Sequence, residues 1–344
     1  MREIVIVISD LFLPPQLEPA ASAVVPLRAA GGSWPGIEHV ARFAHSRPLS
    51  EGWRAWVARW LGLGAYADRP AASIAAASLQ GSAAPACWLA TPLHLIEGLT
   101  RVHVDWRCRL RLRREERQWL GAGFTETFRG SGFELIGLES GEFLLGAPAL
   151  APVRTLEPAR LPLAVMAESL PSGEGAAALR RLGAEIEMWL HTHPLNAERV
   201  RRGEPSVSTL WVWGGGGPAV QAPVPVPAAA PHAVFGSDAY VQGLCRLAGI
   251  ESRPVPCAWA GGAGAPRTLC AVDLLDGLRG EGGTGVLDAL ADLDRRLIAP
   301  WVDVLRQGGI ERLRLLANDR LWSLRAADRW RLWRRRRTGL GGLT

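Results

Sequence analysis

Lysine is absent from the sequence, so all 39 basic residues are arginine. A Schiff base or a lysine nucleophile is therefore excluded from any chemistry that the chain performs. Alanine, glycine and proline are abundant, and the codon bias of a GC-rich genome is the simplest explanation for both features.

Cysteine and histidine are also sparse. The five cysteines are odd in number and no pair has C-x-x-C spacing. This argues against a disulfide framework or a zinc knuckle and favours buried, reduced thiols. No histidine follows His232, so the last third of the chain lacks the commonest metal ligand.

Long apolar runs are missing too. The first run, at 4–8, is stopped by Asp10 and is too short for the core of a signal peptide. No segment approaches the roughly 18 apolar residues that a membrane-spanning helix needs. We therefore expect a cytoplasmic protein.

The composition that remains is globular, with 48% hydrophobic and 21% charged residues. The β-branched run at 4–8 is typical of a strand buried on both faces, as in a parallel sheet. Strand and helix patterns alternate along the chain, which predicts an α/β core with a mainly parallel sheet. The predicted strands lie at 4–8, 209–213 and 312–316, and the helices at 53–63, 71–79, 172–191, 237–248 and 286–305, with Ser172 as an N-cap and a kink at Pro300.

Residues 86–165 have a different texture. An alternating strand pattern at 101–105 is followed by helical spacing at 113–128 and by two short strands around the turn at 139–142. A strand, a helix and a hairpin in this order predict a small α+β unit inserted into the larger core.

Several segments carry a resemblance to a known family. In order they are Leu170–Gly173, His193–Arg199, Gly203–Pro205, Leu210–Gly216, Gly236–Asp238 and Gly243–Gly249. This order resembles the archaeal-type, 2,3-bisphosphoglycerate-independent phosphoglycerate mutases of the alkaline phosphatase superfamily. Pro92–Leu95 and the Trp/Arg-rich end at 329–333 are more similar still to a bacterial offshoot, the RpfE-type regulatory or phosphoglycerate-mutase-like proteins. The resemblance covers roughly residues 85–337 and is most specific at 193–216.

The resemblance implies a doubly wound α/β core like that of alkaline phosphatase, formed by residues 1–85 and 166–344. It also implies that residues 86–165 are an inserted substrate-type domain. Members of the family transfer a phosphoryl group with two divalent metals and a serine nucleophile. Their metal ligands are an Asp-Gly after the first strand and later Asp-x-x-x-His and Asp-His motifs.

The metal-binding pattern is only partly kept in this sequence. Asp10 ends the first predicted strand, where a metal-binding Asp belongs, but Leu11 follows it in place of Gly. Arg279 and Arg320 stand near the places where the family has His. A guanidinium does not give up its proton to bind a metal and repels a dication. We therefore expect no metal pair and no cofactor; misalignment or different ligands are the alternative.

Arginine at such positions can instead bind phosphate or carboxylate through its fork of N–H groups. The backbone N–H groups of a glycine run can also hold an anion. The sequence therefore predicts a site for a small phosphorylated acid, such as phosphoglycerate, at the carboxyl edge of the sheet. Its residues are Asp10, Asn196, Arg199, Gly214, Gly215, Gly216, Arg279 and Arg320, of which Asn196 and Arg199 are placed there by the resemblance alone.

Structural alternatives stay open for these features. Asp10 could be a remnant or a cap, and the glycine run a plain turn without phosphate-loop character. His191 and His193 have ligand-like spacing but follow a predicted helix, which favours a capping role. Ser237 is better placed to cap a helix than to act as a nucleophile.

Residues 320–337 form a basic segment. They include eight Arg and one Asp, a net charge of +7 that exceeds the +6 of the whole chain. Trp322, Trp330 and Trp333 lie among these arginines. Such a tail can contact nucleic acid by phosphate binding and stacking, or an anionic membrane surface. A terminal β-hairpin with snorkelling arginines is the structural alternative.

The predicted function is that of a phosphoglycerate-mutase-like protein that is not catalytic, because its metal site is degenerate. It would be regulatory or bind a small anionic ligand. The alternative is an active metal-dependent mutase or phosphotransferase with atypical ligands, which leaves its status as an enzyme open.

Overall fold

The computed structural model describes residues 2–12, 34–79, 84–97, 102–103, 108–163, 166–220, 232–256, 266–274 and 286–330. The chain forms two compact units. Unit 1 comprises Met1–Ala67, Pro225–Asp238 and Gly249–Thr344, and unit 2 comprises Asp68–Val224 and Ala239–Ala248. Each unit has a sheet and a hydrophobic core of its own.

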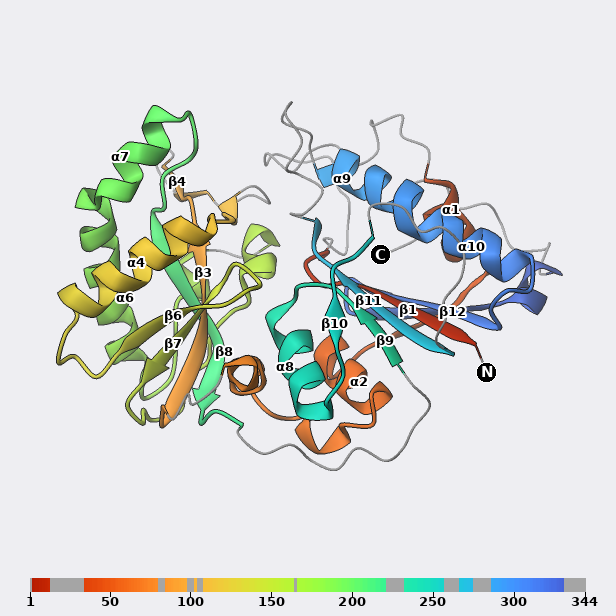
Figure 1. The fold of residues 1–344 in the computed structure, drawn as a ribbon, viewed down its shortest axis with the longest axis horizontal. Coiled ribbons are helices and arrows are strands. Elements are labelled where there is room, and N and C mark those ends of the chain that lie inside the picture. Colours follow the sequence, from red (N-terminus) through yellow and green to blue (C-terminus); the bar gives the residue numbers. More distant parts are fainter. Residues whose placement is uncertain are drawn as a thin grey trace. The chain divides into compact units, whose positions relative to one another are not determined.

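Unit 1 is built on a seven-stranded sheet with the order β10-β9-β11-β1-β12-β13-β2 (Figure 1). Neighbours from β10 to β12 run parallel, whereas β13 is antiparallel to both β12 and β2. The predicted first strand is confirmed, and all six of its residues are buried between β11 and β12. The strands are β1 (Glu3–Ile8), β2 (His45–Pro48), β9 (His232–Phe235), β10 (Ser252–Arg253), β11 (Arg267–Val272), β12 (Arg312–Ala317) and β13 (Arg320–Arg325).

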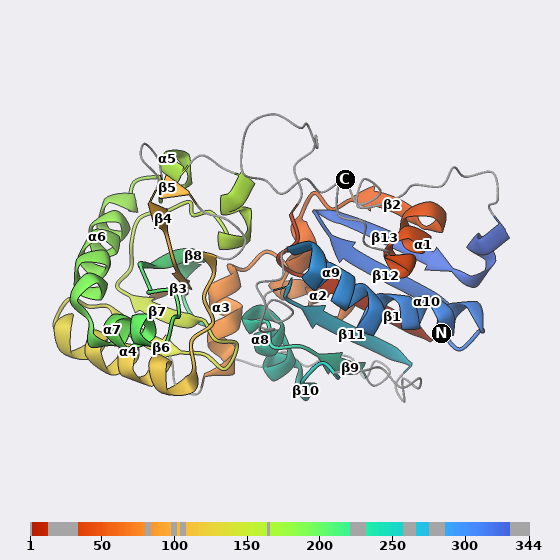
Figure 2. The ribbon, with the colours of Figure 1, turned by 90° about the horizontal axis from the view of Figure 1, so that it is seen from above.

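Helices cover both faces of this sheet, as a doubly wound fold requires (Figures 1 and 2). On one face, α1, α9 and α10 enclose a core that contains Ile4, Ile6, Leu315 and Trp301. On the other face lies α2, whose tryptophans contact strand residues. The helices are α1 (Pro35–Phe43), α2 (Gly52–Trp60), α9 (Val286–Leu293) and α10 (Ala299–Arg306), with 3-10 turns at Gly64–Tyr66 and Ala326–Trp330.

The helix expected at 286–305 is interrupted by a π-helical turn, Asp294–Ile298, directly before α10. Pro300 is the second residue of α10, where its missing N–H costs no hydrogen bond within that helix. The sequence predicted a kink at the proline. In the structure the turn before the proline is widened to a π-helical turn, which interrupts the regular helical hydrogen bonds there.

The π-helical turn also caps α1. The carboxylate of Asp294 is fully buried and accepts hydrogen bonds from Gly36 N at 3.1 Å and Ile37 N at 2.7 Å. Gly36 has to be glycine here, because a Cβ would lie 2.5 Å from Ala299 N and 2.6 Å from the Asp294 carboxylate. Burial raises the pKa of Asp294 to about 6, against the lowering effect of the two backbone hydrogen bonds.

Unit 2 contains a four-stranded antiparallel sheet with the order β6-β7-β3-β8. The hairpin predicted at 133–145 is confirmed as β6 and β7. The strand predicted at 209–213 is also present, but it pairs antiparallel with β3 and extends through the glycine run. The strands are β3 (Ala86–Leu93), β6 (Glu134–Gly137), β7 (Phe143–Ala147) and β8 (Thr209–Gly217), with a small separate pair formed by β4 (Ile96–Glu97) and β5 (Val102–His103).

Two cores flank the sheet of unit 2, and Figure 2 shows α3 on the face opposite α4 and α6. Phe124 of α4 and Ile186 of α6 pack with Trp88 on one face, while Leu89, Trp211 and Trp213 point to the other. Ser172 does not cap α6, which begins at Ala176. The helices are α3 (Ala71–Ala75), α4 (Arg114–Thr127), α5 (Met166–Ser169), α6 (Ala176–Thr192), α7 (Pro194–Arg201) and α8 (Ala239–Ala248), with 3-10 turns at Ala76–Ser78 and Pro158–Leu163.

The predicted insert at 86–165 lies inside unit 2, whose bounds are wider. The difference has a physical cause, since β8 completes the sheet and α6 covers it, and both follow residue 165 in the sequence. The basic segment predicted as a tail at 320–337 is not a single unit. Residues 320–325 form β13 in the sheet of unit 1, and the chain beyond Trp330 lies outside the described residues.

The four described cysteines are buried and free. Burial raises the pKa of the Cys87 thiol to about 11 and that of Cys245 to about 12. None of the described helices is long and apolar enough to span a bilayer.

Candidate functional site

Three parallel strands of unit 1 end side by side. Register places Ile8 opposite Val272 and Val7 opposite Leu316, so the residues after β1, β11 and β12 meet at one edge of the sheet. In open α/β sheets this carboxyl edge is where ligands bind. We call the residues that follow these strand ends the carboxyl-edge cluster; they are Ser9, Asp10, Asp273, Asn318, Asp319 and Arg320.

Asp10 ties two of these strand ends together. Its carboxylate is 4% exposed and accepts a hydrogen bond of 2.9 Å from Leu274 N, just beyond β11. The neighbouring Ser9 donates both its N–H and its hydroxyl to the carbonyl of Val272. Asp10 therefore lies where the sequence predicted it, at the end of the central strand, and holds the loop after β11 in place.

The turn between β12 and β13 supplies the rest of the cluster. Asn318 and Asp319 have φ values of 49° and 52°, and Ala317 pairs with Arg320 across them. Positive φ at both central residues defines a type I′ hairpin turn, for which Asn and Asp are among the favoured residues. Asn318 N donates to Leu11 O at 2.8 Å, which joins this turn to the segment after β1. The Asn-Asp pair is a hairpin signal that the sequence reasoning missed.

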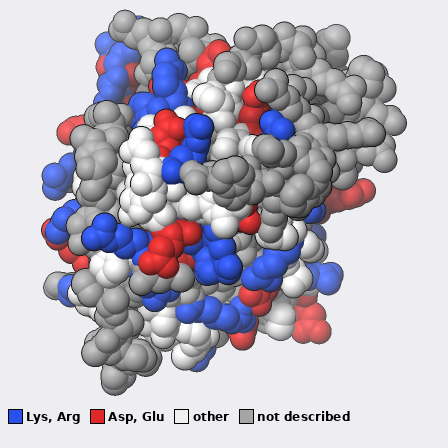
Figure 3. Space-filling model, turned by 90° about the vertical axis from the view of Figure 1, so that its right-hand side faces the viewer, with Lys and Arg blue, Asp and Glu red and all other residues white. Residues whose placement is uncertain are grey.

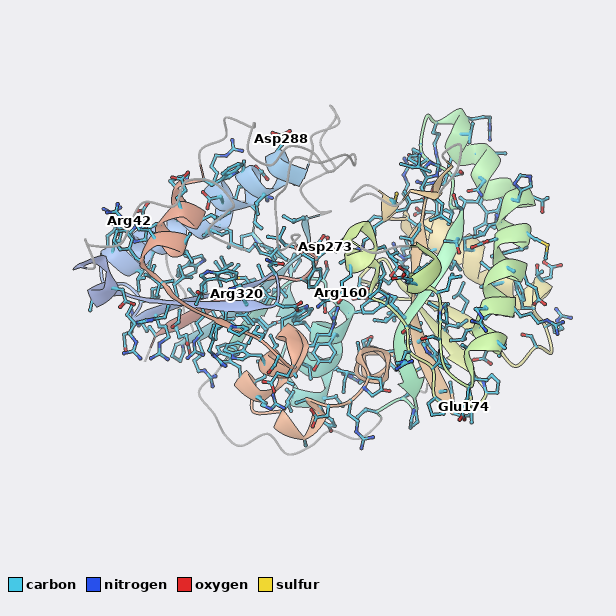
Figure 4. All side chains as sticks on the ribbon, turned by 180° about the vertical axis from the view of Figure 1, so that it is seen from behind. Arg42, Arg160, Glu174, Asp273, Asp288 and Arg320 are labelled. Atoms are coloured by element: carbon cyan, nitrogen blue, oxygen red, sulfur yellow. The ribbon has the colours of Figure 1, made fainter. Side chains whose placement is uncertain are left out.

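Arg320 begins β13 and is labelled with Asp273 in Figure 4. Its guanidinium is partly exposed and donates to Ser46 Oγ at 3.3 Å, a bond that uses one of its five N–H groups. Arg320 is thus a cation at the edge where β12 ends, next to the Asn318–Asp319 turn. Arg279, its predicted counterpart after β11, lies outside the described residues.

The described residues of this edge combine carboxylates with a cation. The carboxylates are Asp10, Asp273 and Asp319, and the cation is Arg320, which directly follows Asp319 in the sequence. Across the described ranges, no group of three or more His, Cys, Asp or Glu side chains has a geometry that would hold a metal.

Asn196 and Arg199 lie in unit 2 and have protein partners. The amide of Asn196 donates to Leu190 O and Val207 O and accepts from Val207 N, at 2.7–2.9 Å. It therefore fastens the segment before β8 to the end of α6. Binding of a ligand by Asn196 stays a prediction.

Arg199 is 4% exposed and lies in a network of charges between α4 and α7. Its guanidinium bonds both carboxylate oxygens of Glu116 at 3.0 Å and the Pro205 carbonyl at 2.7 Å. Glu116 also accepts from Arg202 and from the N-cap N–H of Arg113. These hydrogen bonds satisfy the buried ion pair of Arg199 and Glu116. The two residues are 83 positions apart, so the sequence alone does not show that they pair.

The glycine run lies in β8 as an irregular strand segment. Cys87 pairs with Gly217 and Leu89 with Trp213, so Gly214, Gly215 and Gly216 stand opposite Trp88 alone. This is a β-bulge, and Gly214 and Gly216 have φ values of 65° and 109°. A Cβ on Gly215 would lie 2.1 Å from the Cys87 carbonyl and 2.4 Å from the Trp88 ring.

The sheet topology corrects the prediction that Asp10 and the glycine run lie at the edge of one sheet. Asp10 follows a strand of the mainly parallel, seven-stranded sheet of unit 1, whereas Gly214–Gly216 lie within a strand of the antiparallel sheet of unit 2. The prediction failed because the apolar run at 209–213 does not reveal which strand it pairs with. Anion binding by these glycines stays a prediction.

His193 has a capping role, as the sequence favoured. It ends α6 and its Nδ1 accepts a hydrogen bond from Leu195 N at 3.1 Å, which caps α7. Burial lowers the pKa of His193 and keeps the ring neutral, as an acceptor nitrogen requires. Trp119 and Trp189 pack edge-on against the ring. His191 lies on the exposed side of α6.

Comparison with known proteins finds similarity only at the level of structure. No protein-family model and no curated protein matches the sequence. A solved structure of a cofactor-independent phosphoglycerate mutase from Thermoplasma acidophilum DSM 1728 is 16% identical over 94% of this chain and 89% of that chain, with a TM-score of 0.37. The PH0037 protein from Pyrococcus horikoshii is 14% identical over 94% and 87%, with a TM-score of 0.48. At such values neither structure tells what this chain binds or catalyses.

Proposed function

We propose that the chain is a phosphoglycerate-mutase-like protein that does not perform two-metal phosphoryl transfer and that binds a small phosphorylated acid. Its role would be regulatory, as the resemblance to the RpfE-type proteins implies. The observation that supports this most is Arg320 at the carboxyl edge of the sheet, where that resemblance leads one to expect a metal-binding histidine.

The chemistry of the edge favours an anion. Arg320 keeps its positive charge at any physiological pH and has N–H groups that Ser46 does not use. A phosphate or carboxylate takes two parallel N–H bonds from such a fork. Asp10 and Asp319 then suit the hydroxyl groups of the same ligand, because a carboxylate accepts hydrogen bonds from a hydroxyl.

The test combines metal analysis with calorimetry on the full chain. Protein purified in manganese-supplemented buffer is expected to retain no pair of bound metals. Titration with 3-phosphoglycerate is expected to give heat, and Arg320→Gln should weaken the affinity by about 10- to 100-fold, since a hydrogen bond to a charged group contributes about 1.5–3 kcal/mol.

The matched control is Arg295→Gln, which removes the same charge from an exposed position on the π-helical turn. It should bind like the wild type. No heat with the wild type, or equal affinity in Arg320→Gln, would remove Arg320 from the site. Two equivalents of bound metal together with mutase activity would favour the alternative, an active enzyme with atypical ligands.

A further inference from the structure

Arginine lines the opposite, amino end of the seven-stranded sheet. Register places Arg267 of β11, Glu3 of β1 and Arg312 of β12 in one row, and Arg325 of β13 follows next to Arg312. Paired residues point to the same face of a sheet, so the four side chains form a row on the face that α2 covers in part. Across three strand spacings of about 4.8 Å, this row is about 14 Å long.

Two further rows add cations to the same face. Arg314 pairs with Ser323, which pairs in turn with His45. Arg47 of β2 pairs with Leu321 in the next row, that of Leu316, which lies nearer the carboxyl edge. His45, Arg47 and Arg325 are exposed. Among the described strand residues on this face, Glu3 is the only acidic one, against five arginines. We call Arg47, Arg267, Arg312, Arg314 and Arg325 the arginine face.

The inner arginines are held in fixed positions. Glu3 is 3% exposed and contacts Arg314 Nε at 3.0 Å and Arg312 at 3.9 Å. Trp60 of α2 donates from its indole to Glu3, and its ring lies 4.2 Å below the guanidinium of Arg267. Arg267 also donates to the Trp60 carbonyl at 2.6 Å. Fixed guanidiniums lose little entropy when they bind an anion.

The outer arginines have unused donors. The described residues include no hydrogen-bond or ion-pair partner for the guanidiniums of Arg47 and Arg325. Like charges also crowd around Arg314. Burial lowers the pKa of its guanidinium, Glu3 raises it, and the neighbouring arginines Arg312, Arg267 and Arg47 lower it further. Figure 3, which looks at the right-hand side of Figure 1, shows arginine side chains across this side of the molecule, with acidic side chains interspersed among them. Among the described strand residues of this face, Glu3 is the one carboxylate against the charge of five arginines.

We propose that the arginine face binds the phosphate backbone of duplex nucleic acid. The row of Arg267, Arg312 and Arg325 spans about 14 Å, which suits a ligand whose anionic groups follow one another along a backbone, as the phosphates of a duplex strand do. It is too wide for a single phosphate group. Trp56 and Trp60 are buried beneath the guanidiniums and offer no face for stacking bases, so recognition is through the backbone.

A membrane surface fits this face less well. Peripheral membrane binding combines basic residues with apolar side chains that enter the lipid. The exposed large apolar residues of the described chain are Ile96, Trp119, Leu170, Met188 and Val200, and all belong to unit 2. The arginine face therefore has the charge for an anionic bilayer but lacks the apolar component.

Fluorescence anisotropy with a labelled 20-base-pair DNA duplex tests the proposal at 50 and 200 mM salt. The variant Arg47→Gln/Arg325→Gln removes two exposed guanidiniums without a described partner. Each lost phosphate contact lowers the salt slope of binding by about 0.9. The ratio of the wild-type affinity to the variant affinity should therefore fall about 12-fold as the salt concentration rises from 50 to 200 mM.

Two controls separate the site from net charge and from misfolding. Arg129→Gln/Arg246→Gln removes the same two charges from exposed positions in unit 2 and should keep the wild-type slope. Arg47→Lys/Arg325→Lys keeps the charges and should also keep most of that slope. The arginines beyond residue 330 are the same in every variant and cancel in the comparison.

Three results would overturn the proposal. The first is the absence of duplex binding by the wild type at 50 mM salt. The second is an equal loss of slope in the two Gln double variants, which would indicate general charge attraction. The third is binding to phosphatidylserine vesicles that depends on Arg47 and Arg325 while duplex binding does not, which would assign the face to lipid.

Discussion

Replacement of Asp294 by asparagine should remove a pH dependence from the stability of unit 1. The carboxyl is fully buried and its pKa in the folded protein is about 6, whereas the ordinary value is 3.8. The folded state therefore binds more protons than the unfolded state between these values, and the stability of the wild type falls as the pH rises from about 4 to about 7.

The size of the effect follows from the shift. A difference of about two pKa units corresponds to about 3 kcal/mol, at about 1.4 kcal/mol per unit. Asparagine has nearly the same shape and no charge in this range. It retains one oxygen for the hydrogen bonds from Gly36 N and Ile37 N, so the variant loses part of the α1 cap at every pH.

The assay is urea unfolding of both proteins at pH 4.5, 6.0 and 7.5. The free energy of unfolding of the wild type relative to Asp294→Asn should fall by about 2 kcal/mol from pH 4.5 to pH 7.5, because at pH 4.5 the unfolded carboxyl is already mostly ionised. Asp292→Asn, a change of the same charge two residues away at the surface, should follow the wild type. A constant difference between wild type and Asp294→Asn across the three pH values would refute the reasoning.

Two further predictions concern unit 2. Gly215→Ala should destabilise the protein by about 1–3 kcal/mol, because the new Cβ would overlap Cys87 and Trp88. Gly183→Ala, in a helix with nothing within 4 Å of the new Cβ, should stabilise the protein by about 0.5–1 kcal/mol. Thermal unfolding measures both effects, and an unchanged stability of Gly215→Ala would contradict the bulge. Arg199→Met should cost about 3–5 kcal/mol by removing the buried cation of the pair and leaving Glu116 with Arg202 as its remaining ion-pair partner, and Glu116→Leu in the same chain should recover part of that cost. If this double variant also binds 3-phosphoglycerate like the wild type, Arg199 has a structural role only.

Local patterns in the sequence predicted the elements well but not their partners. The run at 4–8 is confirmed because a strand buried on both faces has a distinctive composition. The hairpin at 134–147 is confirmed because its turn is short and local. By contrast, β8 pairs with β3, more than a hundred residues earlier, and nothing in the pattern at 209–213 distinguishes that sheet from the one containing β1.

The same limit applies to the candidate site. Asp10 could be placed because it directly follows the first strand, and Arg320 could be placed from its position near a late strand. The interpretation of residues 320–337 as a basic tail did not anticipate that Trp322 lies in the core of unit 1, where it is 2% exposed. The structural alternative given for the basic segment, a β-hairpin, is confirmed for residues 320–325, which pair antiparallel with 312–317.

The position of β1 has a consequence for the order of assembly. Its residues pair with residues 267–272 on one side and 312–316 on the other, so of these 344 residues about four fifths must be synthesised before the first neighbour is complete and about nine tenths before the second is. Unit 2 draws nearly all of its residues from one continuous stretch and has no such delay. Until then an apolar β-branched segment, the kind most prone to pair with other chains, stays without its partner strands. A nascent chain that stops before residue 312 leaves that segment without the partner on one of its two sides.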